Sequence, residues 1–246
     1  MKDRFSNHAS GYATFRPTYP KELYEFLLKH VKRNHVAWDC GTGNGQVARD
    51  LAPYFKEVRA TDISINQIKQ AVPSANIYYS ISPAEKTSFP DATFDLITVA
   101  QAIHWFNIQE FYSEVTRVAR PDAFLAVWGY GVLRVSPPVD ELIDDFYVNI
   151  IGPYWDAGRK LIDDHYKSVP FPFEEISAPS FGFSFEWTLA AFEGYLGTWS
   201  SVQKYIVANS ANPVGALIEK IKLHWDAQKL SVKFPLFMRC GHIRNL

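Results

Sequence analysis

Short apolar runs alternate with amphipathic segments over the first half of this sequence, and this alternation limits the fold more than any other feature. Runs typical of buried strands occur at 35–39, 57–62, 76–80, 94–99 and 123–128. Patterns with helical spacing occur at 20–33, 46–51, 65–71 and 107–119. Strands that alternate with helices pair in parallel through right-handed crossovers. The sequence therefore predicts an α/β fold built on a doubly wound, mostly parallel sheet.

The pattern changes after about residue 130. Helical spacing follows at 137–151, 155–166, 189–208 and 213–228, and strand-like segments follow at 181–187 and 230–239. We expect a seven-stranded sheet whose last strand is antiparallel, with a helical cap formed by C-terminal insertions. No glycine- and serine-rich linker divides the chain, so one domain would span 1–246. Its core would cover about 20–130, 173–187 and 230–240, with cap insertions at about 136–166 and 188–228.

Charge balance and cysteine content exclude several classes of protein. The chain has 25 basic and 26 acidic residues and a formal net charge of -1, so it shows no general attraction for a nucleic-acid backbone. Cys40 and Cys240 are far apart, which excludes a disulfide framework and a zinc site with closely spaced cysteine ligands. We expect no metal and a reducing, cytoplasmic setting. Without a signal-like start or a run of about 18 apolar residues, we also expect no secretory signal and no membrane span.

A glycine cluster, DCGTGNG at residues 39–45, directly follows the first predicted strand and precedes a helix. Glycines there let the backbone turn tightly and approach a ligand closely, although a tight turn requires glycine for structural reasons alone. Sheets of this kind bind ligands beyond the carboxyl ends of their strands, near the reversal in strand order. The candidate site therefore lies at the loops after Asp39, Asp62, Ser80 and Val99.

Two acidic residues indicate which ligand the loop would accept. Asp62 ends the second predicted strand, where a carboxylate accepts hydrogen bonds from both ribose hydroxyls of an adenine nucleoside. Asp39 lies at the glycine turn, where it would repel the pyrophosphate of a dinucleotide. S-adenosylmethionine has no phosphate but carries an ammonium and a sulfonium, so an acidic residue under the loop suits it. The third glycine also falls at a GxGxG position and not at that of GxGxxG, which disfavours a nicotinamide oxidoreductase.

Four segments together resemble the class I S-adenosylmethionine-dependent methyltransferases. WDCGTGNGQVA at 38–48 resembles their first motif, and the match continues through TDIS at 61–64 and SPAEKTSFPDATFDLITVAQAIHWF at 82–106. YATFRPTYP at 12–20 completes the set. The pattern is similar to the small-molecule group that includes trans-aconitate methyltransferases, and it covers about residues 5–130.

The resemblance implies S-adenosyl-L-methionine as cofactor, S-adenosyl-L-homocysteine as product and in-line methyl transfer. Asp62 would hold the ribose, Ile63 would pack against adenine, and Ala84 and Glu85 would meet the adenine edge. The full set of implied cofactor residues is Tyr12, Arg16, Asp39, Gly41, Thr42, Gly43, Gly45, Gln46, Asp62, Ile63, Ala84, Glu85, Ala100, Gln101 and Ala102.

The segment IHWF at 103–106 follows the fourth predicted strand and therefore lies at the mouth of the cleft. His104 is the candidate catalytic base, since an unperturbed imidazole titrates near neutrality; its alternative role is packing or hydrogen bonding in this turn. A carboxylate acceptor would need no base, whereas an amine or a hydroxyl would profit from one. The candidate substrate-binding residues are Tyr19, His104, Trp105, Tyr130, Tyr195 and Trp199.

Three alternatives to an enzyme acting on small molecules stay open. A nucleic-acid methyltransferase would normally carry an Asn/Asp-Pro-Pro-Tyr type of segment after the fourth strand, where this chain has AQAI at 100–103. A methyltransferase of proteins is the second alternative, and a cofactor-binding module without methyl transfer is the third. We expect a small-molecule acceptor, no nucleic acid, no membrane, and a monomer or homodimer.

Overall fold

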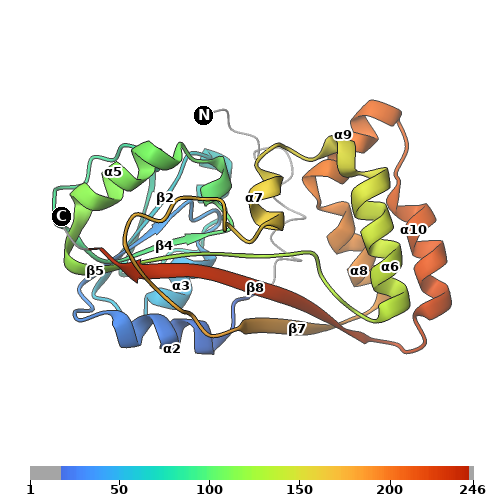
Figure 1. Cartoon of the computed structure of the whole chain (residues 1–246), viewed down its shortest axis with the longest axis horizontal. Helices are drawn as coiled ribbons and strands as arrows, with labels where there is room; N and C mark the ends of the chain where they lie inside the picture. Colours follow the sequence, from blue (N-terminus) through green and yellow to red (C-terminus); the bar gives the residue numbers. More distant parts are fainter. Residues whose placement is uncertain (1–17, 244–246) are drawn as a thin grey trace.

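In the computed structural model, which describes residues 18–243, eight strands form one mixed sheet (Figure 1). Its order is β3-β2-β1-β4-β5-β8-β6, and β7 pairs with β8 off this path. The strands are β1 (Val36–Cys40), β2 (Glu57–Asp62), β3 (Ile77–Ile81), β4 (Phe94–Ala100), β5 (Ala119–Tyr130), β6 (Glu174–Ile176), β7 (Phe181–Trp187) and β8 (Leu230–His242). β1 to β5 pair in parallel, and β6 and β7 both pair with β8 in antiparallel fashion. The predicted doubly wound sheet is confirmed, with eight strands because β6 and β7 share one neighbour.

Helices cover both faces of the parallel strands and gather again at one end of the molecule. α5 lies on one side of the sheet and α2 and α3 on the other, while α6, α8, α9 and α10 form the cap (Figure 1). The helices are α2 (Lys21–His30), α3 (Gln46–Leu51), α4 (Ile65–Ile68), α5 (Ile108–Val118), α6 (Pro137–Asp145), α7 (Arg159–Asp163), α8 (Leu189–Gly197), α9 (Ser200–Asn209) and α10 (Val214–Ile221). Short helical turns are η1 (Ile103–Trp105), η2 (Phe146–Ile150), η3 (Gly152–Tyr154) and η4 (Lys222–His224). Among the described residues, no helix is long and apolar enough to cross a membrane.

The core follows from the two-residue period of the central strands. Leu125 and Val127 of β5 pack into the cluster that contains α5, whereas Phe124 and Trp128 pack into the cluster that contains α2 and α3. Strands buried on both faces are typical of parallel sheets covered by helices. A third cluster joins the cap helices to β8 through Phe234. The carboxyl ends of β1, β2 and β4 are therefore held between two packed layers.

Two of the helices expected after residue 150 differ from the prediction. The segment expected at 155–166 is helical only over Arg159–Asp163, because His165 and Tyr166 have φ of +60° and +59° and leave the helix. The helix expected at 189–208 is divided into α8 and α9. Side chains pair with carbonyl groups left open at the end of α8. The hydroxyl of Thr198 donates to the carbonyl of Tyr195 at 2.7 Å, and Nε2 of Gln203 donates to the carbonyl of Gly197 at 2.6 Å.

Candidate active site

The glycine cluster forms the turn from β1 to α3 at the carboxyl edge of the parallel strands. Gly41, Gly43 and Gly45 have φ of +70°, +57° and +82°, a region that residues with a Cβ atom rarely occupy. The backbone amides of Gly41 and Thr42 both donate to the carbonyl of Thr61 at 2.9 Å, which ties the turn to β2. All three glycines are therefore required by the path of the backbone.

Gly41 also lets the loop approach the segment that follows β4. A Cβ atom on Gly41 would lie 2.6 Å from Cβ of Ala102 and 3.3 Å from Cζ of Phe106. β1 and β4 are neighbours in the sheet, and the strand order reverses between them. The glycine loop and the segment after β4, both predicted to bind the cofactor, therefore lie in contact. They meet at the point where doubly wound sheets bind ligands.

Asp62 lies at the end of β2, beside the glycine loop. The amide of Gly43 donates to its Oδ2 at 2.9 Å, and the amide of Ser64 donates to its Oδ1 at 2.8 Å. Ile63, next along the chain, is half-buried. The two amides fix the carboxylate against the loop, which is the position that recognition of a ribose requires.

Asp39 holds the loop from beneath. It is 1% exposed and accepts hydrogen bonds from the hydroxyls of Thr42 (2.5 Å) and Thr98 (3.1 Å) and from the amide of Ala48 (3.1 Å). Burial raises the pKa of this carboxyl to about 6, against the opposing effect of its hydrogen bonds. Asp39 therefore acts on the loop directly, and its contact with a cofactor stays a prediction.

The raised pKa of Asp39 gives a test of this burial. Between about pH 4 and pH 6 the Asp39 carboxyl is mostly protonated in the folded chain and mostly ionised in the unfolded chain. The free energy of unfolding therefore falls as the pH rises through this range. We expect the free energy of unfolding of the wild type, relative to Asp39→Asn, to fall by about 2 kcal/mol between pH 4 and pH 7. Denaturant unfolding of both chains at several pH values measures the difference. A difference that does not change with pH would show that Asp39 titrates normally.

Two buried acceptors, one in the glycine loop and one directly after β4, suit a ligand that donates hydrogen bonds. Oδ1 of Asn44 and Oε1 of Gln101 are buried and have no hydrogen-bond partner among residues 18–243. Gln101 has φ of +53°, its amide donates to the carbonyl of Trp128 at 2.9 Å, and its Nε2 donates to the carbonyl of Tyr130 at 3.1 Å. Leaving a buried acceptor unpaired costs about 1–3 kcal/mol. The ammonium of S-adenosylmethionine is a donor of the kind that these oxygens lack, so the residues present fit this cofactor.

The remaining predicted cofactor residues lie around the same edge of the sheet. Ala84 and Gln46 are buried, and Ala100 ends β4. Oε1 of Glu85 accepts the amide of Asn107 at 2.9 Å, so this carboxylate holds the beginning of α5. Contact of these side chains with a cofactor stays a prediction.

His104 begins the other half of the site, in η1 directly after β4. Its Nδ1 is 3.0 Å from the hydroxyl of Tyr166, and the two rings are stacked with an angle of 24°. Burial, reinforced by the positive charge of Arg159, lowers the pKa of His104 to about 3. Burial also raises the pKa of Tyr166, which is 1% exposed. Both side chains are therefore neutral near pH 7.

Comparison with known proteins agrees with this geometry. Residues 38–127 match a family described as a methyltransferase domain. A Dictyostelium discoideum protein named as a methyltransferase is 33% identical over 245 residues, which cover 96% of this chain and 93% of that protein. The chain belongs to the class I S-adenosylmethionine-dependent methyltransferases. Membership implies that it binds S-adenosylmethionine.

Two further relatives show how much of this methyltransferase is shared with other proteins. A solved structure of a type II methyltransferase from Anaeromyxobacter dehalogenans is 37% identical, covers 94% of this chain and 100% of that one, and superposes with a TM-score of 0.87. A Saccharomyces cerevisiae protein named as an S-adenosylmethionine-dependent methyltransferase is 30% identical over 131 residues, 50% of this chain and 45% of that one. The likeness therefore extends through the cap in one relative and is confined to about half of the chain in the other.

The predicted substrate residues of the methyltransferase do not all lie together in the structure. Trp105 packs against His104 with ring centroids 4.8 Å apart, while Trp199 and Tyr195 contact each other in the cap, with ring centroids 6.1 Å apart. Tyr19 is 9% exposed and packs edge-on against Trp128 in the core beside α2.

One further predicted substrate residue, Tyr130, and two predicted cofactor residues, Tyr12 and Arg16, remain. Tyr130 ends β5 and contacts Phe183 and Phe234. Tyr12 and Arg16 lie outside the described residues.

The two side chains that flank His104 were not predicted from the sequence. Tyr166 and Arg159 lie beyond about residue 130, where the resemblance seen in the sequence ends and no motif marks them. Gly158 is the point of contact, because a Cβ atom there would lie 2.6 Å from the carbonyl oxygen of His104. Only the folding of α7 against η1 brings these residues to the site of the methyltransferase.

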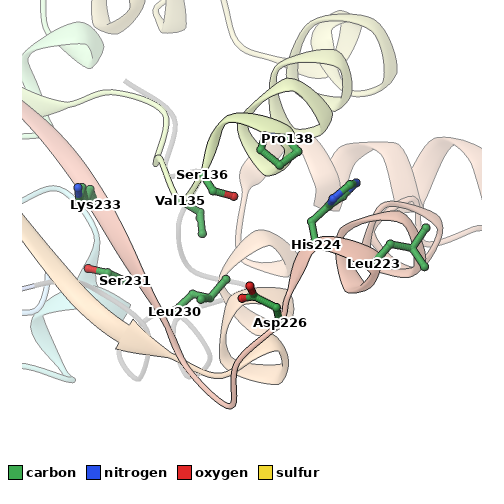
Figure 2. Close-up of a pocket in the computed structure, with 9 residues that line it drawn as sticks. All are labelled: Val135, Ser136, Pro138, Leu223, His224, Asp226, Leu230, Ser231 and Lys233. Atoms are coloured by element: carbon green, nitrogen blue, oxygen red, sulfur yellow. The ribbon is translucent and has the colours of Figure 1, made fainter.

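A hollow in the methyltransferase lies elsewhere, where the cap meets β8 (Figure 2). It has a volume of about 570 Å³ and contains none of the predicted site residues. Its lining consists of Val135, Ser136, Pro138, Leu223, His224, Asp226, Leu230, Ser231 and Lys233. The geometry around the glycine loop and His104 therefore identifies the candidate active site better than cavity volume does.

Proposed function

We propose that this methyltransferase transfers the methyl group of S-adenosylmethionine to a small organic molecule by in-line displacement, leaving S-adenosylhomocysteine. The observation that carries the proposal is the enclosed position of His104, which lies between the rings of Tyr166 and Trp105. Enclosed sites with aromatic walls and few polar groups suit small molecules. The net charge of -1 gives no general attraction for a nucleic acid.

The residues around the glycine loop would hold the methyl donor. Asp62 would accept the ribose hydroxyls, and Ile63 would pack against the adenine ring. Asn44 and Gln101 would accept hydrogen bonds from the ammonium group. The cofactor supplies a methyl group on a positively charged sulfur. The chain's task is then to align the acceptor with that methyl group and to exclude water, which lowers the barrier without a charged catalyst.

The electrostatics of His104 favour a carboxylate oxygen as the acceptor atom. An imidazole with a pKa of about 3 is a weak base at neutral pH, so His104 would remove a proton from an amine or a hydroxyl inefficiently. A carboxylate is already ionised at neutral pH and needs no base. Attack of its oxygen on the methyl carbon forms a methyl ester and breaks the bond to sulfur, whose electron pair stays on the neutral thioether. His104 would then orient the acceptor through a hydrogen bond.

A screen of labelled methyl transfer tests both parts of the proposal. The chain is incubated with methyl-labelled S-adenosylmethionine and a panel of carboxylic acids, amines and phenols. We expect label in at least one acid, in a product that alkali cleaves as an ester. Label only in amines, phenols, proteins or nucleic acids would contradict the carboxylate assignment. Calorimetric binding of S-adenosylmethionine without any labelled product would favour the non-catalytic module.

A further inference from the structure

Arg159, the first residue of α7, lies beside the proposed acceptor site. The residue before it, Gly158, lies against His104, since a Cβ atom on Gly158 would lie 2.6 Å from the carbonyl oxygen and 3.6 Å from Cβ of His104. In keeping with this position, the positive charge of Arg159 lowers the pKa of His104. α7 occupies the space between the sheet and the cap helices (Figure 1). Arg159 therefore faces the same place as the hydrogen-bonded pair of His104 and Tyr166.

Aromatic rings enclose this guanidinium. Its central carbon is 4.6 Å from the centroid of the Trp155 ring and 5.1 Å from that of Tyr147. Trp199 contacts both rings, with centroids 5.7 Å from Trp155 and 6.0 Å from Tyr147. The side chain of Arg159 is only 19% exposed. Trp155 and Tyr147 fix the position of the cation, and the three rings, inclined to one another by 41° to 88°, form an aromatic wall beside it.

Two local departures from regular helix build this arrangement. Tyr147 lies in η2, a π-helical turn, and such turns occur frequently at functional sites. His165 and Tyr166 are two consecutive left-handed residues, a conformation that costs about 1–2 kcal/mol for each residue with a side chain. Strained backbone of this kind persists where the surrounding structure imposes it, and it clusters at binding sites. Both departures position side chains around Arg159 and His104.

Only one of the five N–H groups of Arg159 is used within the described chain. Nε donates to the hydroxyl of Tyr147 at 2.5 Å and lies 3.4 Å from Oδ1 of Asp163. Nη1 and Nη2 have no hydrogen-bond partner among residues 18–243. The indole nitrogen of the adjacent Trp155 is likewise buried without a partner in this range. These groups are all donors, and the two terminal nitrogens of Arg159 are not fully buried, so they are open to an acceptor from a bound molecule.

We propose that Arg159 binds a carboxylate of the methyl acceptor through its two terminal nitrogens, while the rings of Tyr147, Trp155 and Trp199 contact the acceptor's planar body. The inference rests on the proposed function and deepens it. The bound carboxylate is distinct from the group that is methylated, because pairing with a guanidinium withdraws negative charge from both oxygens and so weakens their attack on the methyl carbon. Arg159 is then a specificity-determining residue.

The charges around Arg159 favour a carboxylate over a phosphate. Lys204 of α9 pairs with Asp156 at 2.7 Å and so adds no open cation. Asp163 lies on the Nε side of the guanidinium. A single guanidinium matches a carboxylate in both charge and fork geometry, whereas a dianionic phosphate would be left undercompensated.

Calorimetric titration of the chain saturated with S-adenosylhomocysteine tests the assignment without turnover. The probes are cinnamate, its neutral isostere cinnamamide, and inorganic phosphate at constant ionic strength. We expect cinnamate to bind roughly 10- to 100-fold more tightly than cinnamamide and more tightly than phosphate, because charged hydrogen bonds are lost with the amide. Arg159→Gln should bind the acid and the amide within about twofold of each other. Arg159→Lys should keep part of the preference, because it retains the charge but not the fork.

The ratio of acid to amide affinity separates binding from a structural role, since a loss of folding would weaken both probes together. Arg134→Gln, which breaks the exposed cap ion pair of Arg134 with Asp144, is the matched control and should keep the wild-type ratio. Equal binding of both probes by the wild type, no binding of cinnamate, tighter binding of phosphate, or an intact preference in Arg159→Gln would overturn the inference. An intact preference without methyl transfer in any screen would overturn the proposed function alone.

Discussion

Replacing Gly41 with alanine is expected to destabilise the fold by about 2–4 kcal/mol and to abolish cofactor binding. Two costs combine: φ of +70° disfavours any residue with a Cβ atom, and the new Cβ would lie 2.6 Å from that of Ala102. Because Ala102 is buried, neither side of this contact has room to move. Denaturant unfolding and calorimetry with S-adenosylhomocysteine measure the two effects.

Two further variants separate the causes. Ala102→Gly in the Gly41→Ala background removes the close contact but leaves the backbone conformation, so it should recover only part of the loss. Gly215→Ala, in α10, is the matched control, because a Cβ atom there would meet nothing within 4 Å. It should raise the free energy of unfolding by about 0.5–1 kcal/mol, as expected for glycine to alanine inside a helix. Wild-type stability in Gly41→Ala would show that the loop tolerates another path.

Removing the carboxylate of Asp62 is expected to weaken binding of S-adenosylhomocysteine by about 100-fold. Two charge-assisted hydrogen bonds to the ribose would be lost, and each contributes a net free energy of about 1.5 kcal/mol, the lower end of the usual range. Asp62→Ala would also leave the amides of Gly43 and Ser64 without the acceptor that now orients the loop. Calorimetry of the folded variant gives the affinity, and thermal unfolding reports whether the loop is retained.

Asp62→Asn and Asp144→Ala complete this experiment. The asparagine keeps one carbonyl oxygen but points an NH2 group at a backbone donor, so it should bind with intermediate affinity. Asp144 forms an exposed ion pair with Arg134 in the cap, and its removal should leave cofactor affinity unchanged. Equal affinity of Asp62→Ala and the wild type would rule out Asp62 as the ribose residue.

The sequence by itself determined the parallel half of the fold and the cofactor side of the site. Helix α3 and strands β2 and β7 have the predicted bounds, and Ser64 caps α4 as expected of a serine before a helix. These features depend on contacts between residues close in sequence and on a two-residue or helical period of apolar residues. A single sequence shows both the contacts and the period. The glycines and Asp62 follow strands of a parallel sheet, so their meeting at one edge is a consequence of topology.

The tertiary structure alone decided the acceptor side. Tyr147, Arg159 and Tyr166 lie in segments where helical spacing was predicted, 137–151 and 155–166. That spacing shows neither the π-helical turn nor the left-handed pair, and it does not show which of these side chains face His104. The environment of His104 was equally hidden, because the titration of an imidazole depends on its burial and on neighbours that are distant in the chain. Local propensity fixes where strands and turns form, but only packing between remote segments places charges and rings around a substrate.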